Sequence, residues 1–226
     1  QAPARQAGIK GGLPKSVEAT TLNKMCGSGM QAAIMGRSAI MSGDADIIVA
    51  GGMESMSNAP HMMPTHRAGF KYGHDVLKDH MAQDGLEDAY EKKPMGVYAD
   101  MIAQEHQFTR EQQDAYALET LARAQRATKD GDFKREITPV TLTTRKGDVV
   151  VDTDELPRRA MPDKIPSLRP AFSKDGTVTA ANASGISDGA AALVLMRKSE
   201  AERRGLKPLA RIVATAAHAH EPAYFT

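Results

Sequence analysis

The chain lacks tryptophan, has a single cysteine and contains no apolar run long enough to cross a membrane. One cysteine cannot form an internal disulfide, which is typical of a reducing compartment, so we expect a cytoplasmic protein. Aromatic residues make up 4% of the chain, too few for a protein that stacks on bases or sugars. Because 41% of the residues are hydrophobic, a disordered or collagen-like chain is excluded and a soluble globular protein of one or two domains is expected.

An excess of charge of either sign is also absent. The sequence has 29 basic and 28 acidic residues, and neither kind is gathered into blocks. Nucleic-acid-binding proteins carry a basic patch, so we expect no nucleic-acid partner and no membrane association, but small molecules or further subunits. The sequence begins at Gln1 without a recognisable secretory or organellar signal, and we interpret it as a chain that misses its true start.

The apolar pattern alternates between the periods of strands and helices, which is typical of an α/β protein. Residues 53–94 show no sustained period and are expected to form a long loop. Thr109, followed three residues later by Gln112, predicts a helix that starts with a capping box. Strands are expected at residues 17–21, 47–50, 177–181, 191–196 and 209–217, and a hairpin at residues 137–151. Helices are expected at residues 30–41, from residue 96, at residues 109–129 and from residue 199.

Cys26 lies between a predicted strand and a predicted helix. The N–H groups and partial positive charge of a first helical turn can stabilise a thiolate. Gly27 and Gly29 permit a tight turn and the close approach of a substrate carbonyl, whose developing oxyanion backbone N–H groups could hold. A lone cysteine is about as often an inert core residue, so these residues alone leave both interpretations open.

Three blocks of the sequence closely resemble successive blocks of the thiolases. The first is NKMCGSGM at residues 23–30, and the others are IIVAGGMESM at 47–56 and TAANASGISDGAA at 179–191. The likeness keeps its register over essentially the whole chain, including QAPARQA at residues 1–7. This resemblance implies that Cys26 is the catalytic nucleophile.

The resemblance also implies a reaction, which is acyl transfer between coenzyme A thiols by a ping-pong route. Cys26 would hold the acyl group as a thioester, so that two acetyl-CoA are interconverted with acetoacetyl-CoA and free coenzyme A. The expected partners are therefore acetyl-CoA, acetoacetyl-CoA and coenzyme A, the last acting as a substrate. No separate cofactor is expected.

The resemblance also implies a binding site for coenzyme A. Seven positions match residues that contact the nucleotide and the pantetheine arm in the family. Arg158 would offer its guanidinium group to the adenine or a phosphate, and Ser184 its hydroxyl to the pantetheine amide. Met95, Phe172 and Ile186 would form apolar walls, although Phe172 and Ile186 could equally be core residues and Arg158 a solvated surface group. The full set is Leu86, Met95, Arg158, Phe172, Ala180, Ser184 and Ile186.

The fold that the resemblance implies is part of a layered αβα core of the thiolase type. Its mixed five-stranded sheet would be interrupted by a large α+β loop domain. Residues 1–57 and 179–226 would belong to the N-terminal core domain, and residues 58–178 to the loop domain, which binds coenzyme A and joins subunits. Residues 66–73 align with the loop through which tetrameric thiolases join two dimers, so we expect a homo-oligomer that is a dimer of dimers.

Other features of the thiolases are missing from the sequence. The C-terminal thiolase domain is absent, and with it the Asn-Glu-Ala-Phe, Gly-His-Pro and second cysteine blocks that complete the family's catalytic machinery. We therefore expect a fragment, or part of a longer polypeptide, that is inactive alone. Pro94 stands where many members have a histidine, and Leu156 where potassium-binding members have a tyrosine. No metal site is expected, because His218 and His220 lack a full set of ligands at suitable spacing.

Three functions remain open at this point. Met95 and the basic loop favour an acetyl-CoA acetyltransferase over a thiolase that acts on longer substrates. The alternative in the same class is a longer-chain or dicarboxylic 3-ketoacyl-CoA thiolase of fatty-acid or aromatic degradation. The alternative in another class is a non-catalytic, thiolase-like subunit that binds coenzyme A esters.

Overall fold

The computed structural model describes residues 1–225, which form two compact units. Unit 1 comprises Gln1–Pro60 and Ser187–His218, and unit 2 comprises His61–Ile186 with the segment that follows from Ala219. None of the helices in the described residues is both long and apolar enough to span a membrane.

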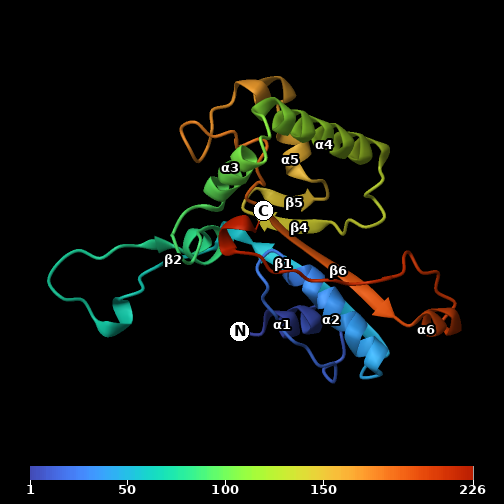
Figure 1. The fold of residues 1–226 in the computed structure, drawn as a ribbon. Helices are drawn as coiled ribbons and strands as arrows, with labels where there is room; N and C mark the ends of the chain where they lie inside the picture. The colour runs from blue at the N-terminus through green and yellow to red at the C-terminus, as the bar shows by residue number, and fades with distance from the viewer. Residues whose placement is uncertain (226) are drawn as a thin grey trace. The chain divides into compact units, whose positions relative to one another are not determined.

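Unit 1 is built around one antiparallel strand pair with a helix on it. The pair joins β1 (Ile47–Ser55) to β6 (Asp188–Met196), in a register that places Ile47 opposite Met196. Helix α2 (Ser28–Ser42) runs beside β1 in Figure 1 and contacts both strands. Of the mixed five-stranded sheet that the resemblance implies, the described residues form this pair.

The packing of α2 requires a small residue where the helix crosses the strands. A Cβ atom at Gly36 would lie 3.1 Å from Ile48 Cγ2 and 3.2 Å from Leu195 Cδ1, so any larger residue would have to displace these side chains by a few tenths of an ångström. Beyond the helix, Gly43 has a φ of 89°, and Arg197 donates to the Ile40 carbonyl at 3.0 Å. The predicted helix at residues 30–41 is therefore confirmed, and its C-terminal end is held by Gly43 and Arg197.

Two of the predicted strands in unit 1 are wrong. Residues 17–21 are irregular, because Arg5 of helix α1 (Pro3–Lys10) binds the Val17 carbonyl and, at 2.7 Å, the Lys15 carbonyl. Residues 209–217 are also irregular, and the described residues bring no strand beside them. A β-prone segment becomes a strand only when a neighbouring strand pairs with its backbone. The predicted helix at residue 199 is found as α6 (Lys198–Arg203).

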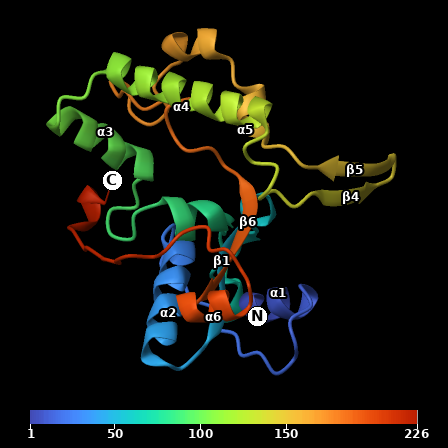
Figure 2. The same cartoon turned by 90° about the vertical axis from the view of Figure 1, so that its right-hand side faces the viewer.

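The helices of unit 2 follow the sequence signals closely. Helix α4 (Arg110–Asp130) begins with the predicted capping box between Thr109 and Gln112, and it ends at Gly131 with a φ of 80°. The predicted hairpin is also found, as β4 (Val140–Thr144) paired with β5 (Gly147–Val151), and it projects away from α4 in Figure 2. The other helices of the unit are α3 (Met95–Glu105) and α5 (Glu155–Arg159).

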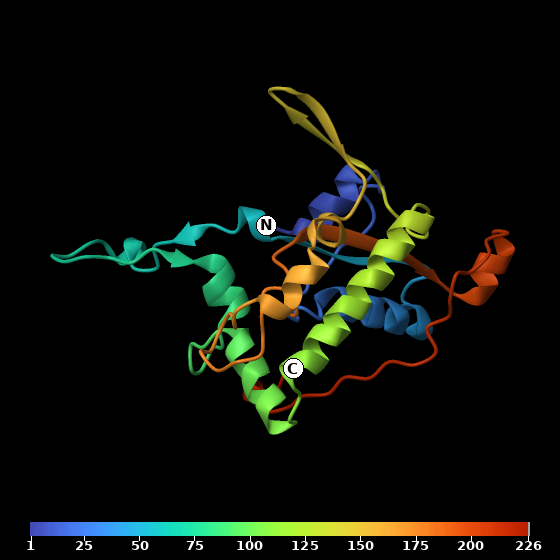
Figure 3. The same ribbon diagram turned by 90° about the horizontal axis from the view of Figure 1, so that it is seen from above.

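The rest of unit 2 consists of short elements and loops. The expected long loop contains the two-residue strands β2 (His61–Met62) and β3 (Lys78–Asp79), and the segment between them runs out as an arm in Figure 3. The strand predicted at residues 177–181 is wrong, because this segment forms turns stabilised by side chains. Short helices lie at Met56–Asn58 of unit 1 and, in unit 2, at His66–Ala68, Ala82–Leu86 (η3), Pro162–Ser167 and Pro222–Tyr224.

Candidate functional site

Cys26 is exposed and lies two residues before the start of α2. The N-cap residue Gly27 brings no side-chain hydrogen bond to the first turn of the helix, and Cys26 directly precedes this partially positive helix start. The expected strand before Cys26 is not formed, and an isolated bridge between Lys24 and Cys26 stands in its place. The thiol is therefore at a helix start, as predicted, but on a turn and not at the end of a strand.

This turn is stabilised by hydrogen bonds within its own residues. Met25 has a φ of 50°, a left-handed conformation that costs a non-glycine residue about 1 kcal/mol. Asn23 Oδ1 accepts from Met25 N at 2.8 Å, and Ser28 Oγ donates to the Met25 carbonyl at 2.6 Å. Ser28 Oγ also accepts from Lys24 N at 2.8 Å. These bonds offset the cost at Met25 and fix the position of Cys26.

Two glycine contacts set where the turn sits on unit 1. A Cβ atom at Gly52 would lie 3.2 Å from the Cα atom of Gly29, so the start of α2 and strand β1 approach backbone to backbone. At Gly51, a Cβ atom would overlap the carbonyl oxygen of Ala191 on β6. The glycine pair thus lets both the helix and the neighbouring strand come close beneath the nucleophile turn.

The third block of thiolase-like sequence, residues 179–191, includes the end of the strand pair at which Ser55 lies opposite Asp188. Asp188 Oδ1 accepts from Ser57 N at 2.9 Å, and this backbone hydrogen bond lowers the pKa of Asp188 from its ordinary value. Beside it, Ser187 N donates to Met56 Sδ at 3.4 Å. The carboxylate therefore holds the chain after β1 against the start of β6.

In unit 2, the structure brings Met95 and Phe172 together. Met95 is the first residue of α3, and the ring of Phe172 packs so closely on Gly96 that a Cβ atom there would overlap it. Phe172 remains 43% exposed, so it is not a core residue here. Two of the proposed apolar walls therefore lie at the same end of α3.

A second cluster forms around α5. A Cβ atom at Gly185 would lie 2.8 Å from Leu156 Cδ1, so α5 contacts the segment that contains Ser184 and Ile186. Helix α5 also carries Arg158, and all three candidate side chains are exposed, Ile186 by 63%. The cluster thus exposes a guanidinium group, a hydroxyl group and an apolar side chain. These groups could contact a ligand that has both polar and apolar parts.

The remaining two candidates take part in neither of these contacts. Leu86 ends the single π-helical turn η3 and is 38% exposed. Ala180 is exposed in the turn that follows Thr179, which is fully buried. The structure therefore groups five of the seven candidates around two contacts.

Sequence reasoning missed the polar side chains beneath the segment that contains Ala180 and Ser184. Asn182 donates to Asp114 Oδ1 at 3.1 Å and accepts from Thr179 N at 2.7 Å. Asp114 is 5% exposed and also receives Arg110 Nε at 2.7 Å. The spacing of Arg110 and Asp114, four residues apart in a predicted helix, was the available signal for this ion pair.

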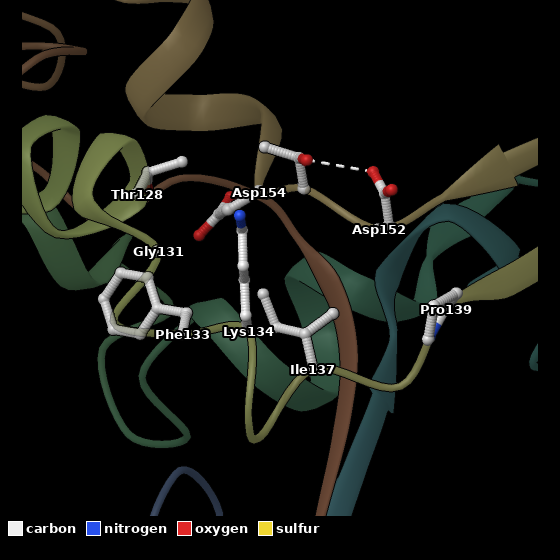
Figure 4. A pocket seen from close by; sticks show the side chains of 9 residues that line it. Thr128, Gly131, Phe133, Lys134, Ile137, Pro139, Asp152 and Asp154 are labelled. Atoms are coloured by element: carbon white, nitrogen blue, oxygen red, sulfur yellow. Dashed lines mark hydrogen bonds between the residues drawn. The ribbon is translucent and has the colours of Figure 1, made fainter.

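A cavity of about 310 Å³ lies elsewhere in unit 2, beside the C-terminal end of α4. In Figure 4, Lys134 extends toward Asp154, and Thr153 hydrogen-bonds Asp152 at 2.9 Å. None of the seven candidates lines this cavity, so it is separate from the proposed coenzyme A contacts. Its lining residues are Thr128, Gly131, Phe133, Lys134, Ile137, Pro139, Asp152, Thr153 and Asp154.

Comparisons with known proteins agree on one family. Residues 1–199 match the family described as "Thiolase, N-terminal domain". The chain is 51% identical to an acetyl-CoA acetyltransferase of Allochromatium vinosum over 225 residues, which cover 99% of this chain and 57% of the relative. It is 48% identical to an acetyl-CoA acetyltransferase of Saccharomyces cerevisiae, covering 100% of this chain and 58% of the relative.

A solved structure gives the same result for the fold. The chain is similar to the Acat5 thiolase from Ascaris suum in complex with coenzyme A, with a TM-score of 0.84 and 46% identity. The match covers 92% of this chain and 53% of that one. This chain thus spans a little more than half the length of the relatives it matches.

Proposed function

Because this chain belongs to the thiolase family, we propose that it supplies the nucleophile for acyl transfer between coenzyme A thiols. The reaction interconverts two acetyl-CoA with acetoacetyl-CoA and free coenzyme A. The observation that carries the proposal is Cys26 itself, which is exposed at the start of α2 on a turn fixed by its own hydrogen bonds.

The chemistry proposed for Cys26 needs a thiolate and a place for negative charge. The sulfur attacks the carbonyl carbon of the acyl-CoA, and the electron pair of that C=O bond moves to the oxygen. When the C=O bond re-forms, the C–S bond to coenzyme A breaks, so coenzyme A leaves as a thiolate and the acyl group stays on Cys26. In this proposal, the partial positive charge at the start of α2 stabilises the attacking thiolate and the transient oxyanion.

For coenzyme A, we propose the exposed groups of unit 2. Arg158 pairs with a phosphate or covers the adenine, and Ser184 hydrogen-bonds the pantetheine amide. Phe172 and Met95, which lie at the same end of α3, contact the apolar part of the arm. Leu86, Ala180 and Ile186 complete the proposed contacts, and the named relatives support acetyl-CoA as the acyl donor.

We also propose a domain organisation, an oligomeric state and a cellular location. Residues 1–57 and 179–226 act as the core domain and residues 58–178 as the loop domain. Exposed Phe70 and Tyr72 in the β2–β3 arm support a dimer of dimers joined through this loop. We place the protein in the cytoplasm, in fatty acid metabolism, with no metal cofactor, no nucleic-acid partner and no membrane partner.

The experiment is to treat the full-length polypeptide with acetyl-CoA, measure its intact mass and map the modified residue. We expect one added acetyl group, located on Cys26 and released by free coenzyme A. The Cys26→Ser variant is the control and should acquire no thioester. If Cys26 stays unmodified while coenzyme A still binds, the catalytic proposal is overturned and the protein is a coenzyme A ester-binding subunit.

Substrate choice is tested separately. Thiolysis of acetoacetyl-CoA is compared with that of 3-ketohexanoyl-CoA, using the same full-length polypeptide and the same coenzyme A concentration. We expect a higher kcat/KM for acetoacetyl-CoA, because Met95 and Phe172 restrict the apolar part of the proposed site. A higher kcat/KM for the longer substrate would instead assign a longer-chain 3-ketoacyl-CoA thiolase.

A further inference from the structure

Residues 176–186, here named the 176–186 loop, are buried in their middle and exposed at their end. Thr179 is fully buried and Val178 is 7% exposed, whereas Ser184 and Ile186 are exposed. The segment contains no helix or strand, so its buried backbone groups need partners of another kind. Side chains from α3 and α4 provide several of these partners.

Asn182 is the centre of the hydrogen bonds in this loop. Its Oδ1 atom accepts from Thr179 N at 2.7 Å, and its Nδ2 atom donates to the Thr177 carbonyl at 3.0 Å and to Asp114 Oδ1 at 3.1 Å. Ala183 N donates in turn to the Thr179 carbonyl at 3.0 Å. The amide thus uses its acceptor and both of its donors, which fixes the turn at residues 177–183.

Asp114 extends this network across α4. One of its oxygens receives Asn182, and the other receives Arg110 Nε at 2.7 Å. The same guanidinium group donates to the carbonyls of Ile165 and Leu168, both at 3.0 Å. Since Leu168 lies four residues before Phe172, a single buried carboxylate joins the segment leading to Phe172 with the loop leading to Ser184.

Helix α3 holds the beginning of the loop. Asp100 Oδ1 accepts from Thr177 N and Val178 N, each at 2.9 Å. The other oxygen of Asp100 is buried so close to Gly176 that a Cβ atom there would overlap the carboxylate. The helix that carries Met95 is therefore joined to the same loop.

We propose that Asn182, held by Asp114, is a positioning residue for coenzyme A. It fixes the 176–186 loop before the ligand arrives, so that Ser184 and Ile186 pay no ordering cost on binding. This inference rests on the proposed function. An amide meets all the demands of the position, because it donates to the Asp114 carboxylate and to the Thr177 carbonyl while it accepts from Thr179 N. An aspartate would place two carboxylates about 3 Å apart, at the spacing Asn182 now has.

The experiment compares Asn182→Asp with Thr109→Ala by calorimetric titration with coenzyme A and by thermal unfolding. Thr109→Ala removes the capping box of α4, the helix that carries Asp114. The Thr109 side chain makes no hydrogen bond to the loop, so this variant is the control for lost stability. We expect Asn182→Asp to raise the Kd for coenzyme A by about tenfold, equivalent to about 1.4 kcal/mol. Thr109→Ala should leave the Kd unchanged although its unfolding temperature falls.

A second experiment asks whether coenzyme A affinity is recovered when the hydrogen bond between positions 182 and 114 is restored. The double variant Asn182→Asp with Asp114→Asn exchanges donor and acceptor, restores one hydrogen bond between these positions and should recover part of the affinity. If Asn182→Asp unfolds below the assay temperature, Asn182→Ser is measured in its place, since it weakens the network without adding charge. The same direction of change is expected.

Two results would overturn the inference alone. One is that Asn182→Asp binds coenzyme A with the same Kd as the wild type. The other is that Thr109→Ala raises the Kd for coenzyme A as much as Asn182→Asp does. If the wild-type protein itself bound no coenzyme A, the proposed function would be overturned and this inference with it. The failures of the two claims are therefore distinguishable.

Discussion

The nucleophile turn of unit 1 and the 176–186 loop of unit 2 are both irregular, yet they are stabilised differently. Residues 23–28 are held by hydrogen bonds between neighbours in the sequence, and Cys26 is exposed. The 176–186 loop is held by its own Asn182 and also by side chains 64 to 78 residues away, and its middle is buried. The turn is therefore encoded locally, whereas the loop depends on the packing of α3 and α4.

This difference predicts how each segment responds to substitution. Loss of a bond in the turn should loosen Cys26 without unfolding unit 1, because the turn contributes little burial. Loss of a bond under the 176–186 loop should destabilise unit 2 broadly, because it leaves buried polar groups without partners. The following predictions test this contrast.

The largest effect is expected from Asp114→Ala. The substitution leaves the Arg110 guanidinium group and the donor of Asn182 without their acceptor, and breaking such a buried pair costs about 3–5 kcal/mol. Denaturant unfolding of unit 2 measures the loss. Glu119→Ala is the control, since it breaks an ion pair of the same spacing on α4 that is exposed at both ends and should cost less than about 1 kcal/mol. If the two variants lost equal free energy of unfolding, the Asp114 network would matter no more than an exposed ion pair, and the contrast between the loop and the turn would be contradicted.

A smaller effect is expected from Gly51→Ala in unit 1. The new Cβ atom would overlap the Ala191 carbonyl oxygen, and such overpacking costs about 1–3 kcal/mol. Hydrogen exchange should quicken in α2 and the strand pair while α3 and α4 keep their protection. The control is Gly189→Ala on β6, where a Cβ atom meets open space. Similar exchange in the two variants would show that the close approach at Gly51 does not fix the turn.

A loss of about 1 kcal/mol or less is expected from Ser28→Ala. The variant removes both hydrogen bonds of the Ser28 hydroxyl, so the left-handed Met25 keeps its bond to Asn23 but loses the one from Ser28 Oγ. We expect slower acylation of Cys26 by acetyl-CoA and faster hydrogen exchange at Lys24, with the unfolding midpoint of unit 2 unchanged. Ser38→Ala on the same helix removes only a bond to the Ile34 carbonyl and is the matched control. An acylation rate equal to that of Ser38→Ala would contradict the role given to this turn.

The smallest effect concerns Glu200 of α6, outside both segments. Hydrogen bonds from Arg203 and then Arg204 lower its pKa from 4.5 to about 2. A lowered pKa stabilises the folded state above pH 4.5, and this contribution is lost as the pH falls toward about 2. Hydrogen exchange of α6 should therefore quicken over that range in the wild type and change less in Glu200→Gln. A pH dependence that Glu200→Gln does not reduce would contradict this assignment.

The sequence predicted what is decided by neighbouring residues. Helix α2 ends at Gly43, α4 begins with the capping box of Thr109, and the β4–β5 hairpin forms, all as expected. The α/β fold class of the thiolase type is confirmed by the likeness to the Ascaris suum thiolase. These features depend on capping, turn residues and apolar period, which act over a few positions.

The failures come from side chains that bind the backbone of a strand-like segment in place of a neighbouring strand. Residues 17–21 and 177–181 have the composition of strands, but Arg5 binds carbonyl groups of the first segment and its neighbour, and Asn182, which directly follows the second, binds its backbone groups. In the candidate site, the position of Cys26 at a helix start was predictable from its flanking glycines. The partnership of Asp114 with Asn182 was not, because 68 residues separate them and only the folded chain brings them together.

The most direct test of the central claim is isotope exchange between acetyl-CoA and labelled free coenzyme A, with no other acyl-CoA added. A thioester on Cys26 requires that label enter acetyl-CoA at a rate that depends on both concentrations, and that Cys26→Ser abolish the exchange. Exchange that persists in Cys26→Ser, or its absence in a wild-type protein that binds coenzyme A, would contradict acyl transfer through this cysteine.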